Sequence, residues 1–204
     1  MLETLISFAL ATFILAISPG PDNIFVLTQS AARGSRIGIA IASGLISGCI
    51  VHTSFVALGF AVIIRDNEWL LYTIKIAGAI YLIYLAFKVY QSDAFISLES
   101  QTSKGNWWKM YRAGVTMNLL NPKVTLFYLA LLPQFIIQND IPEWIQVYIL
   151  GVVFMLVSLI VFYAVALLAG AVASFIKSST WFTSVMKWTQ IIVFIGIAIF
   201  IFVN

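Results

Sequence analysis

Ser18-Pro19-Gly20-Pro21-Asp22-Asn23 interrupts an apolar stretch that runs from Leu5 to about Leu27. A second interruption, Asn121-Pro122-Lys123, lies inside an apolar stretch from about Arg112 to Gln134. Proline removes a backbone hydrogen-bond donor and frees a carbonyl one turn earlier, so each motif predicts a broken helix. Breaks inside apolar segments are tolerated only where protein or a watery cavity satisfies the freed backbone groups. The two motifs therefore predict a polar site inside a bundle of helices.

The composition indicates that this bundle lies in a membrane. The 204-residue chain is 62% apolar and 9% charged, with a formal net charge of +3. A soluble domain carries roughly 25% charged residues and cannot hide so much apolar surface, so that class is excluded. The single cysteine, Cys49, excludes a disulfide-stapled secreted fold, and the high apolar content excludes disorder. What remains is a polytopic membrane protein with room for six spans of about 20 residues.

Apolar stretches bounded by polar residues predict six α-helical spans, because lipid offers no partners to open strands. Besides the two interrupted stretches, the spans run over about Ile37 to Ile64, Trp69 to Tyr90, Trp144 to about Ile176, and about Trp181 to Val203. Only the polar stretch from Gln91 to Asn106 is long enough to be a linker. The prediction is one transmembrane domain, residues 1–204, with a first repeat over about 1–90, a linker over about 91–106 and a second repeat over about 107–204.

The basic residues predict the orientation, since positively charged loops stay in the cytoplasm. Eight of them fall in loops or span ends on one side: Arg33, Arg36, Lys88, Lys104, Lys109, Arg112, Lys177 and Lys187. The opposite loops hold a single basic residue, Arg65. All six tryptophans lie at or near span edges, as interfacial anchors do. The linker is therefore expected in the cytoplasm and both termini outside.

This topology gives the two halves opposite orientations in the membrane, and such inverted repeats are a common transporter architecture. Pro21-Asp22 and Pro122-Lys123 recur 101 residues apart, in the first span of each half, although little else matches at that offset. With these boundaries Asp22 lies toward the cytoplasm and Lys123 near the centre of its span. An exact inverted repeat would place the two residues at mirrored depths. Either the predicted span boundaries or the strict pairing of the two motifs is therefore incorrect.

Three ionisable side chains remain at membrane depth: Asp22, Lys75 and Lys123. Each costs roughly 2.5–3.5 kcal/mol at a helix centre, so each needs a partner or a function. Lys75 is interpreted as a side chain that extends to the outer interface. Asp22 is either the N-cap of the helix after the break or part of a functional site. Lys123 either forms a structural bridge with Asp22 or binds a ligand.

Other polar side chains near the breaks either cap helices or line a path: Asn23, Thr28, Gln29, Asn118, Asn121, Thr125 and Gln134. Asn121-Pro122 matches an N-cap followed by a proline at the first helical position, which predicts a helix whose positive end points into the protein. An aspartate, a lysine and a helix N-terminus around one cavity complement a zwitterion. Lys123 would face the carboxylate, and Asp22 an ammonium or a proton. His52 is either a helix–helix hydrogen-bond donor or part of a proton path.

Residues for other chemistries are missing from the sequence. One histidine and one cysteine cannot build a four-ligand site for a soft metal, so no metal or other cofactor is expected. No phosphate-binding loop and no nucleophile–base motif occurs, which predicts a protein that is not an enzyme. Transport would then draw on an ion gradient or on the substrate's own gradient. The alternative is a non-transporting membrane subunit or assembly factor with a structural Asp22–Lys123 bridge.

Small residues four positions apart predict close contacts between helices. Three pairs have this spacing: Gly34 and Gly38, Gly44 and Gly48, and Ala166 and Gly170. Such faces would also suit a homodimer, and the sequence leaves the oligomeric state open.

Several longer motifs point to one family. In the first half they are Ser18-Pro19-Gly20-Pro21-Asp22-Asn23, Gln29-Ser30, Arg33-Gly34 and Lys75-x-Ala77-Gly78-Ala79-x-Tyr81-Leu82-x-Tyr84-Leu85. In the second half they are Gly114-x-x-x-Asn118-Leu119-Leu120-Asn121-Pro122-Lys123 and Leu132-Pro133-Gln134-Phe135. In order and spacing these motifs resemble the lysine-exporter (LysE) superfamily, and most of all its homoserine/threonine-efflux (RhtB) branch. The resemblance covers nearly the whole chain.

The resemblance implies a six-helix exporter of small amino acids in the bacterial inner (plasma) membrane, driven by the proton motive force. It places Asp22, Asn118, Asn121 and Lys123 first among the site residues. Many members carry an acidic residue where this chain has Cys49, a difference that favours a neutral substrate over a cationic one such as lysine. The expected partners are therefore a neutral amino acid, protons and the lipid bilayer, without nucleic acid.

Overall fold

The computed structural model describes residues 1–18, 20–63, 68–91, 106–138, 140–178 and 180–203. All regular elements in these ranges are helical, which confirms the all-α prediction for them. In chain order they are α1 (Leu2–Ile17), α2 (Pro21–Arg33), α3 (Ser35–Ile63), α4 (Glu68–Gln91), α5 (Trp107–Leu120), α6 (Pro122–Leu126), the π-helical turn η1 (Phe127–Leu131), the 3-10 turn η2 (Leu132–Phe135), α7 (Glu143–Ser178) and α8 (Thr180–Val203).

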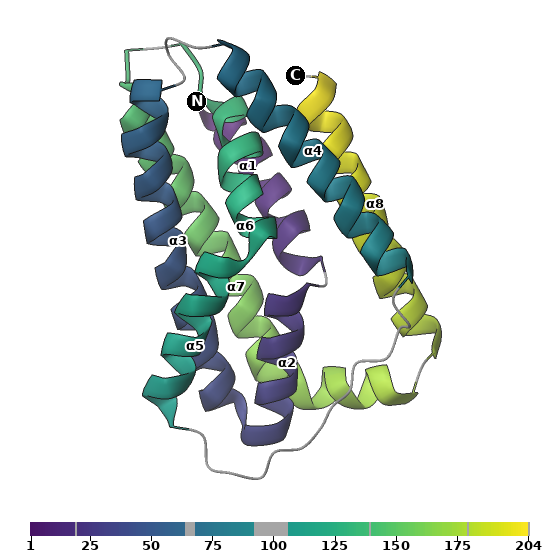
Figure 1. Ribbon diagram of the computed structural model, residues 1–204. Helices are drawn as coiled ribbons and strands as arrows, with labels where there is room; N and C mark the ends of the chain where they lie inside the picture. Colours follow the sequence, from purple (N-terminus) through teal and green to yellow (C-terminus); the bar gives the residue numbers. More distant parts are fainter. Residues whose placement is uncertain (19, 64–67, 92–105, 139, 179, 204) are drawn as a thin grey trace.

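Two helices are broken where the sequence predicts. Pro21 begins α2 and Pro122 begins α6, so each proline takes a first helical position, where its missing N–H costs no bond. The bend between α1 and α2 is 57°, and the bend between α5 and the segment Lys123–Phe135 is 52°. The two broken helices run in opposite directions, with their breaks at the same level (Figure 1). The predicted break residue Pro19 lies outside the described residues.

Two helices are long and apolar enough to cross a membrane: α3 over Ser35–Gly59 and α7 over Glu143–Ala169. Each bent pair adds one more if it is counted as a single broken span, so the described residues supply two to four of the six predicted spans. The other two predicted spans correspond to α4 and α8, which pack against each other. In α8 the described apolar part is Lys187–Phe202, which is shorter than a full span.

The predicted ends of two spans are wrong. The first broken helix continues to Arg33 rather than ending near Leu27, because the polar residues after the break stay helical. The second begins at Trp107 rather than Arg112, because the Asn106 side chain caps it by accepting from the backbone N–H groups of the first turn. Most of the predicted linker, 91–106, lies outside the described residues.

The long helices hold the two breaks between them. α3 packs against α5 and α7, and α7 packs against both α1 and α2. The α4–α8 pair contacts the rest mainly through η1 and through α7, whose last part crosses one end of the bundle in Figure 1. In the same view α1 begins and α8 ends at the opposite end of the bundle.

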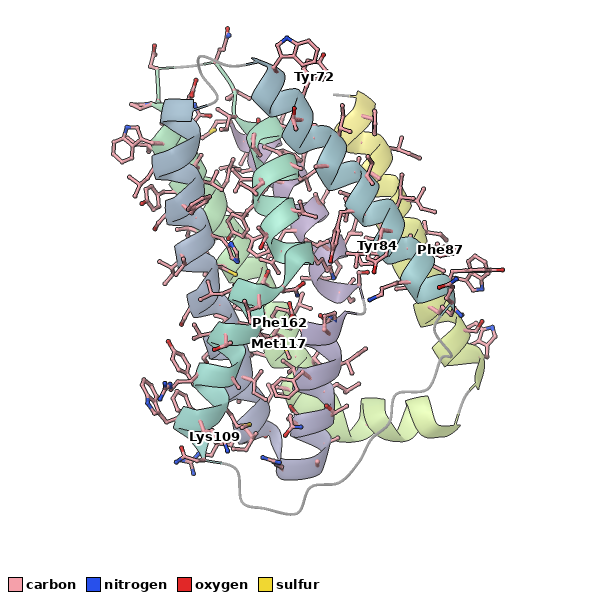
Figure 2. All side chains as sticks on the ribbon, viewed as in Figure 1. Tyr72, Tyr84, Phe87, Lys109, Met117 and Phe162 are labelled. Carbon is pink, nitrogen blue, oxygen red and sulfur yellow. The ribbon has the colours of Figure 1, made fainter. Side chains whose placement is uncertain are left out.

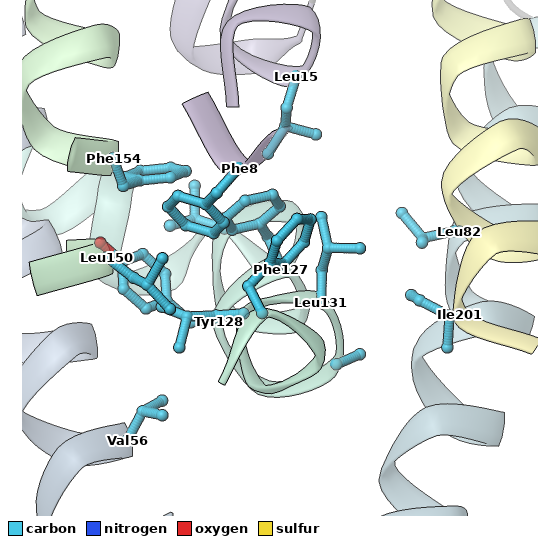
Figure 3. Close-up of a cluster of buried hydrophobic side chains, with 14 of the residues drawn as sticks. Phe8, Leu15, Val56, Leu82, Phe127, Tyr128, Leu131, Leu150, Phe154 and Ile201 are labelled. Atoms are coloured by element: carbon cyan, nitrogen blue, oxygen red, sulfur yellow. The ribbon is translucent and has the colours of Figure 1, made fainter. Parts of the chain in front are cut away.

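The breaks lie where two apolar clusters meet. One cluster gathers around Phe8, Phe127 and Tyr128, whose rings pack together with Phe154 of α7 (Figure 3). The other gathers around Ile41, beside Phe162, which Figure 2 labels below the level of the breaks. Burying each such side chain contributes roughly 1.5–3 kcal/mol in water, and inside a bilayer the same contacts act through close packing.

Glycines allow the closest of these contacts. A Cβ at Gly44 of α3 would overlap the carbonyl of Tyr111, and a Cβ at Gly114 of α5 would overlap the carbonyl of Ile41. Gly38 is equally crowded by Ser30, and Gly48 by Asn118. Three of the predicted small-residue positions, Gly38, Gly44 and Gly48, are therefore confirmed as contact points. Gly34 is not a contact point. Its φ of 92° shows that it is needed instead for the turn that ends α2.

We expect Gly44→Ala and Gly114→Ala to destabilise the bundle by about 1–3 kcal/mol, because each methyl group would push α3 away from α5. Thermal unfolding of the purified protein in detergent measures the effect. Gly59→Ala, on the same helix as Gly44, is the control, since a Cβ at this position would have nothing within 4 Å. This control should keep or raise the unfolding midpoint, and equal midpoints for all three variants would contradict the proposed close approach.

Candidate functional site

The first break leaves carbonyl groups at the end of α1 without helical partners, and side chains from beyond the break satisfy them. Asn23 donates from Nδ2 to the carbonyl of Ala16 at 2.7 Å. Lys123 donates from Nζ to the carbonyls of Leu15 and Ser18 at 3.0 and 3.1 Å. The lysine ammonium therefore lies at the negative end of the α1 dipole, where a cation is favoured.

Asn121 organises the second break. Its Oδ1 accepts from the backbone N–H of Lys123 at 3.0 Å, so the predicted N-cap of the restarted helix is present. Its Nδ2 donates to Oδ2 of Asp22 at 2.7 Å, which ties the two broken helices together across 99 positions of sequence. One amide thus serves a helix end and the carboxylate at the same time.

Asp22 itself is not a helix cap. Gly20 is the N-cap of α2, and Pro21 at the first helical position places Asp22 inside the first turn. The direct bridge to Lys123 is also not formed, because the carboxylate bonds Asn121 and the ammonium bonds two carbonyls. The two charges share one buried site without touching.

The site is almost closed to solvent within the protein. Asp22 is 6% exposed and Lys123 is 7% exposed. Several buried oxygens in or beside the site have no hydrogen-bond partner: Asp22 Oδ1, Asn118 Oδ1, Ser18 Oγ and Thr12 Oγ1. An unpaired buried acceptor costs about 1–3 kcal/mol, so each of these atoms is a candidate acceptor for a ligand's hydrogen bond.

The surroundings of the ammonium come from two further elements. A Cβ at Gly20 would lie 3.3 Å from Lys123 Nζ, so the glycine leaves room for the lysine to reach the end of α1. Phe194 of α8 presents its ring 5.6 Å from the same nitrogen, at a distance where a cation and an aromatic face attract. The α4–α8 pair therefore contributes to the site through this ring.

Asn118 connects the site to α3. The side-chain Nδ2 of Asn118 donates to the sulfur of Cys49 at 3.5 Å. The backbone carbonyl of Asn118 accepts from His52 Nε2 at 3.3 Å. The His52 ring stacks on Tyr128, with 5.5 Å between the ring centroids. The structure thus brings His52 to the carboxyl end of α5, as it brings Lys123 to the carboxyl end of α1.

Two predicted site residues are not part of this cluster. Gln29 is half-buried on α2, two turns after Asp22, and no described hydrogen bond links it to the site. Lys75 is half-buried on α4 and likewise makes no described bond to Asp22 or Lys123. Three of the other polar residues, Thr28, Thr125 and Gln134, bond carbonyls of their own helical segments.

Sequence reasoning missed a row of hydroxyl pairs along α3. Four serine or threonine side chains of this helix each meet a tyrosine hydroxyl from α5, η1 or α7: Ser43 with Tyr163, Ser47 with Tyr111, Thr53 with Tyr128, and Ser54 with Tyr148. The distances lie between 2.9 and 3.4 Å. The only available signal was the presence of hydroxyl side chains inside predicted spans, and it does not identify their partners.

The polar groups that the structure describes in this site are of the kinds that bind organic ions, and they lack the thiolate and imidazole clusters that bind soft metals. Within the described residues no group of three or more His, Cys, Asp or Glu side chains is placed to hold a metal ion. A carboxylate, an ammonium, amides and helix ends are present instead.

The sequence is similar to one known protein family and to several known proteins. The family model described as LysE type translocator matches residues 13–204. The homoserine/homoserine lactone efflux protein of Salmonella typhimurium is 31% identical over 171 residues, which cover 84% of this chain and 82% of that protein. Its Salmonella typhi counterpart of the same name is 32% identical over equal shares. An uncharacterized membrane protein of Vibrio cholerae is 25% identical, with 89% of this chain and 88% of that protein covered. No solved structure matches.

Proposed function

Because the chain belongs to the LysE type translocator family, we propose that it is a secondary transporter that exports a small neutral amino acid such as homoserine or threonine. Membership of this family, together with efflux proteins among the relatives, supports an amino-acid efflux transporter in a membrane. The names of the two Salmonella relatives favour homoserine-like substrates. Cys49 beside Asn118 adds a neutral group to the site, which agrees with an uncharged side chain on the substrate.

One observation carries this proposal: each charged group of the site keeps one position for a ligand. Asp22 uses Oδ2 for Asn121, while Oδ1 is buried without a partner. Lys123 uses two of its three ammonium protons on carbonyls. An amino acid carries a positive ammonium and a negative carboxylate a few ångströms apart. Its ammonium would bind Asp22 and its carboxylate Lys123, with Asn118 Oδ1 as a further acceptor.

The packing supports an alternating-access mechanism built on two inverted repeats. In that arrangement α1–α2 would correspond to α5–α6, α3 to α7, and α4 to α8. The contact of α3 with α5 then has its counterpart in the contact of α7 with α1 and α2, and the α3–α7 and α4–α8 contacts join corresponding helices. Movement of the two halves around the breaks would open the site to one side at a time.

The proposal extends to the energy source and the orientation. We propose that the proton gradient of the bacterial inner membrane drives export, with Asp22 as the group that accepts a proton when no ammonium is bound. Both termini would lie on the periplasmic or extracellular side, opposite the cytoplasmic linker. The basic residues of the sequence support this orientation.

The alternative is a non-transporting membrane subunit. It is favoured by one contact, since Lys123 donates two protons to the end of α1, as a purely structural lysine would. In such a protein the site would only hold the ends of two broken helices together.

Flux through proteoliposomes separates the two functions. Vesicles containing the purified protein and labelled homoserine, threonine or lysine are exposed to an imposed pH gradient, with protein-free vesicles as the control. We expect gradient-dependent flux of homoserine or threonine and little flux of lysine. Absence of flux for every amino acid would favour the non-transporting subunit.

A further inference from the structure

The carboxyl end of α1 gathers oxygen atoms in the middle of the protein. The carbonyls of Leu15 and Ser18 both point at one group, the ammonium of Lys123. The dipole of α1 adds partial negative charge at the same place. Unwound carbonyls at the carboxyl end of a half-helix are the kind of ligand that binds alkali cations in broken-helix transporters.

Further oxygens at this end are unused. Thr12 Oγ1, one turn before Leu15, and Ser18 Oγ have no hydrogen-bond partner, and both residues are 0% exposed. Asp22 Oδ1, just after the break, is a third buried oxygen without a partner. Hydroxyl and carboxylate oxygens are of the hard type that alkali and alkaline-earth cations prefer, so Ser18 Oγ and Asp22 Oδ1, on the two sides of the break, are candidate ligands.

We propose that the carboxyl end of α1 is a binding site for a small monovalent cation such as Na⁺, and that the Lys123 ammonium is its built-in occupant. The ammonium carries the same single charge and makes the same contacts with carbonyl oxygens. Gly20, whose Cβ would lie 3.3 Å from the nitrogen, leaves the occupant room. Asp22 is the one carboxylate bonded into the site among the described residues, so a single positive charge balances it and a divalent ion would leave an excess.

This inference goes beyond the proposed function, because it concerns what stabilises the end of α1 and not which substrate is carried. A tethered ammonium cannot leave with the substrate, so the wild-type protein needs no alkali ion. Removal of the lysine side chain would empty the site and leave its oxygens without a charge partner. The chain would then depend on a dissolved cation.

Thermal unfolding of the full chain in detergent tests the site directly. Wild type, Lys123→Ala and Lys123→Gln are measured in NaCl, LiCl, KCl and choline chloride at equal ionic strength. The wild-type midpoint should be the same in all four salts. Both variants should unfold earlier in choline chloride and recover about 3–6 °C when sodium reaches ten times its dissociation constant.

Two further variants make the result specific. Lys109→Ala removes an exposed lysine from α5 and should respond to no particular cation. Lys123→Ala combined with Asp22→Asn removes the countercharge and should lose most of the sodium response. Equal midpoints in sodium and choline for both single variants would overturn the proposal, and so would a failure of both to fold even in high sodium. No amino acid is present, so this result is independent of the transport assay.

Discussion

Asp22→Asn is expected to lower the initial rate of homoserine export by at least about 30-fold. The substitution keeps the shape of the side chain, and asparagine can still accept the hydrogen bond that Asn121 donates. What it removes is the negative charge opposite the substrate's ammonium. Truncating one member of a buried charge pair costs about 2–5 kcal/mol, and the lower figure already corresponds to about a 30-fold loss.

The rate is measured in proteoliposomes with equal amounts of folded protein, judged by gel filtration before reconstitution. Asp140→Asn makes the same chemical change at an exposed position in the loop before α7 and should transport like wild type. A wild-type rate for Asp22→Asn would exclude Asp22 as the ammonium-binding and proton-accepting group. A loss in both variants would point to a general defect of the assay or of insertion.

The positions of the breaks could be predicted because their causes are local. Pro21 and Pro122 cannot continue a helix from the preceding turn, and Asn121 carries a side chain suited to capping. That Asp22 and Lys123 would need buried polar partners was also predictable, since a charge at membrane depth is costly wherever its partner lies. These conclusions required composition and spacing alone.

The partners of the two charges could not be predicted in the same way. The sequence leaves an Asp22–Lys123 bridge as one of two interpretations of the lysine, beside ligand binding. The structure instead gives Lys123 the carbonyls of Leu15 and Ser18, which are backbone groups that no residue type reveals. Only the antiparallel packing of two broken helices brings these groups to the lysine.

The ends of the two broken helices also could not be predicted from the apolar stretches. Apolar stretches mark where a helix is hydrophobic, but α2 continues through a polar segment to Arg33 and α5 begins at Trp107, before its apolar part. The two breaks lie against each other, as the bond between Asn121 and Asp22 shows. A helix can continue through a polar segment when other helices pack around it, so the end of an apolar stretch does not mark the end of the helix.

The last prediction separates the two roles of Asn121. Asn121→Ala should both destabilise the protein and lower export by more than about tenfold. It removes the cap of α6, worth about 1 kcal/mol, and the donor to Asp22, which leaves a buried carboxylate without its partner. Asn121→Ser keeps a capping oxygen but has no amide that reaches Asp22 at 2.7 Å.

Serine caps helices about as well as asparagine, so Asn121→Ser should recover the part of the stability that the cap supplies. If Asn121 acts on transport by orienting the Asp22 carboxylate, export by the serine variant should stay close to that of the alanine variant. If Asn121 acts only as a cap, serine should restore stability and export together. Unfolding midpoints and proteoliposome rates measured on the same preparations distinguish the two, and full recovery of export by serine would remove Asn121 from the substrate site while leaving its structural bond in place.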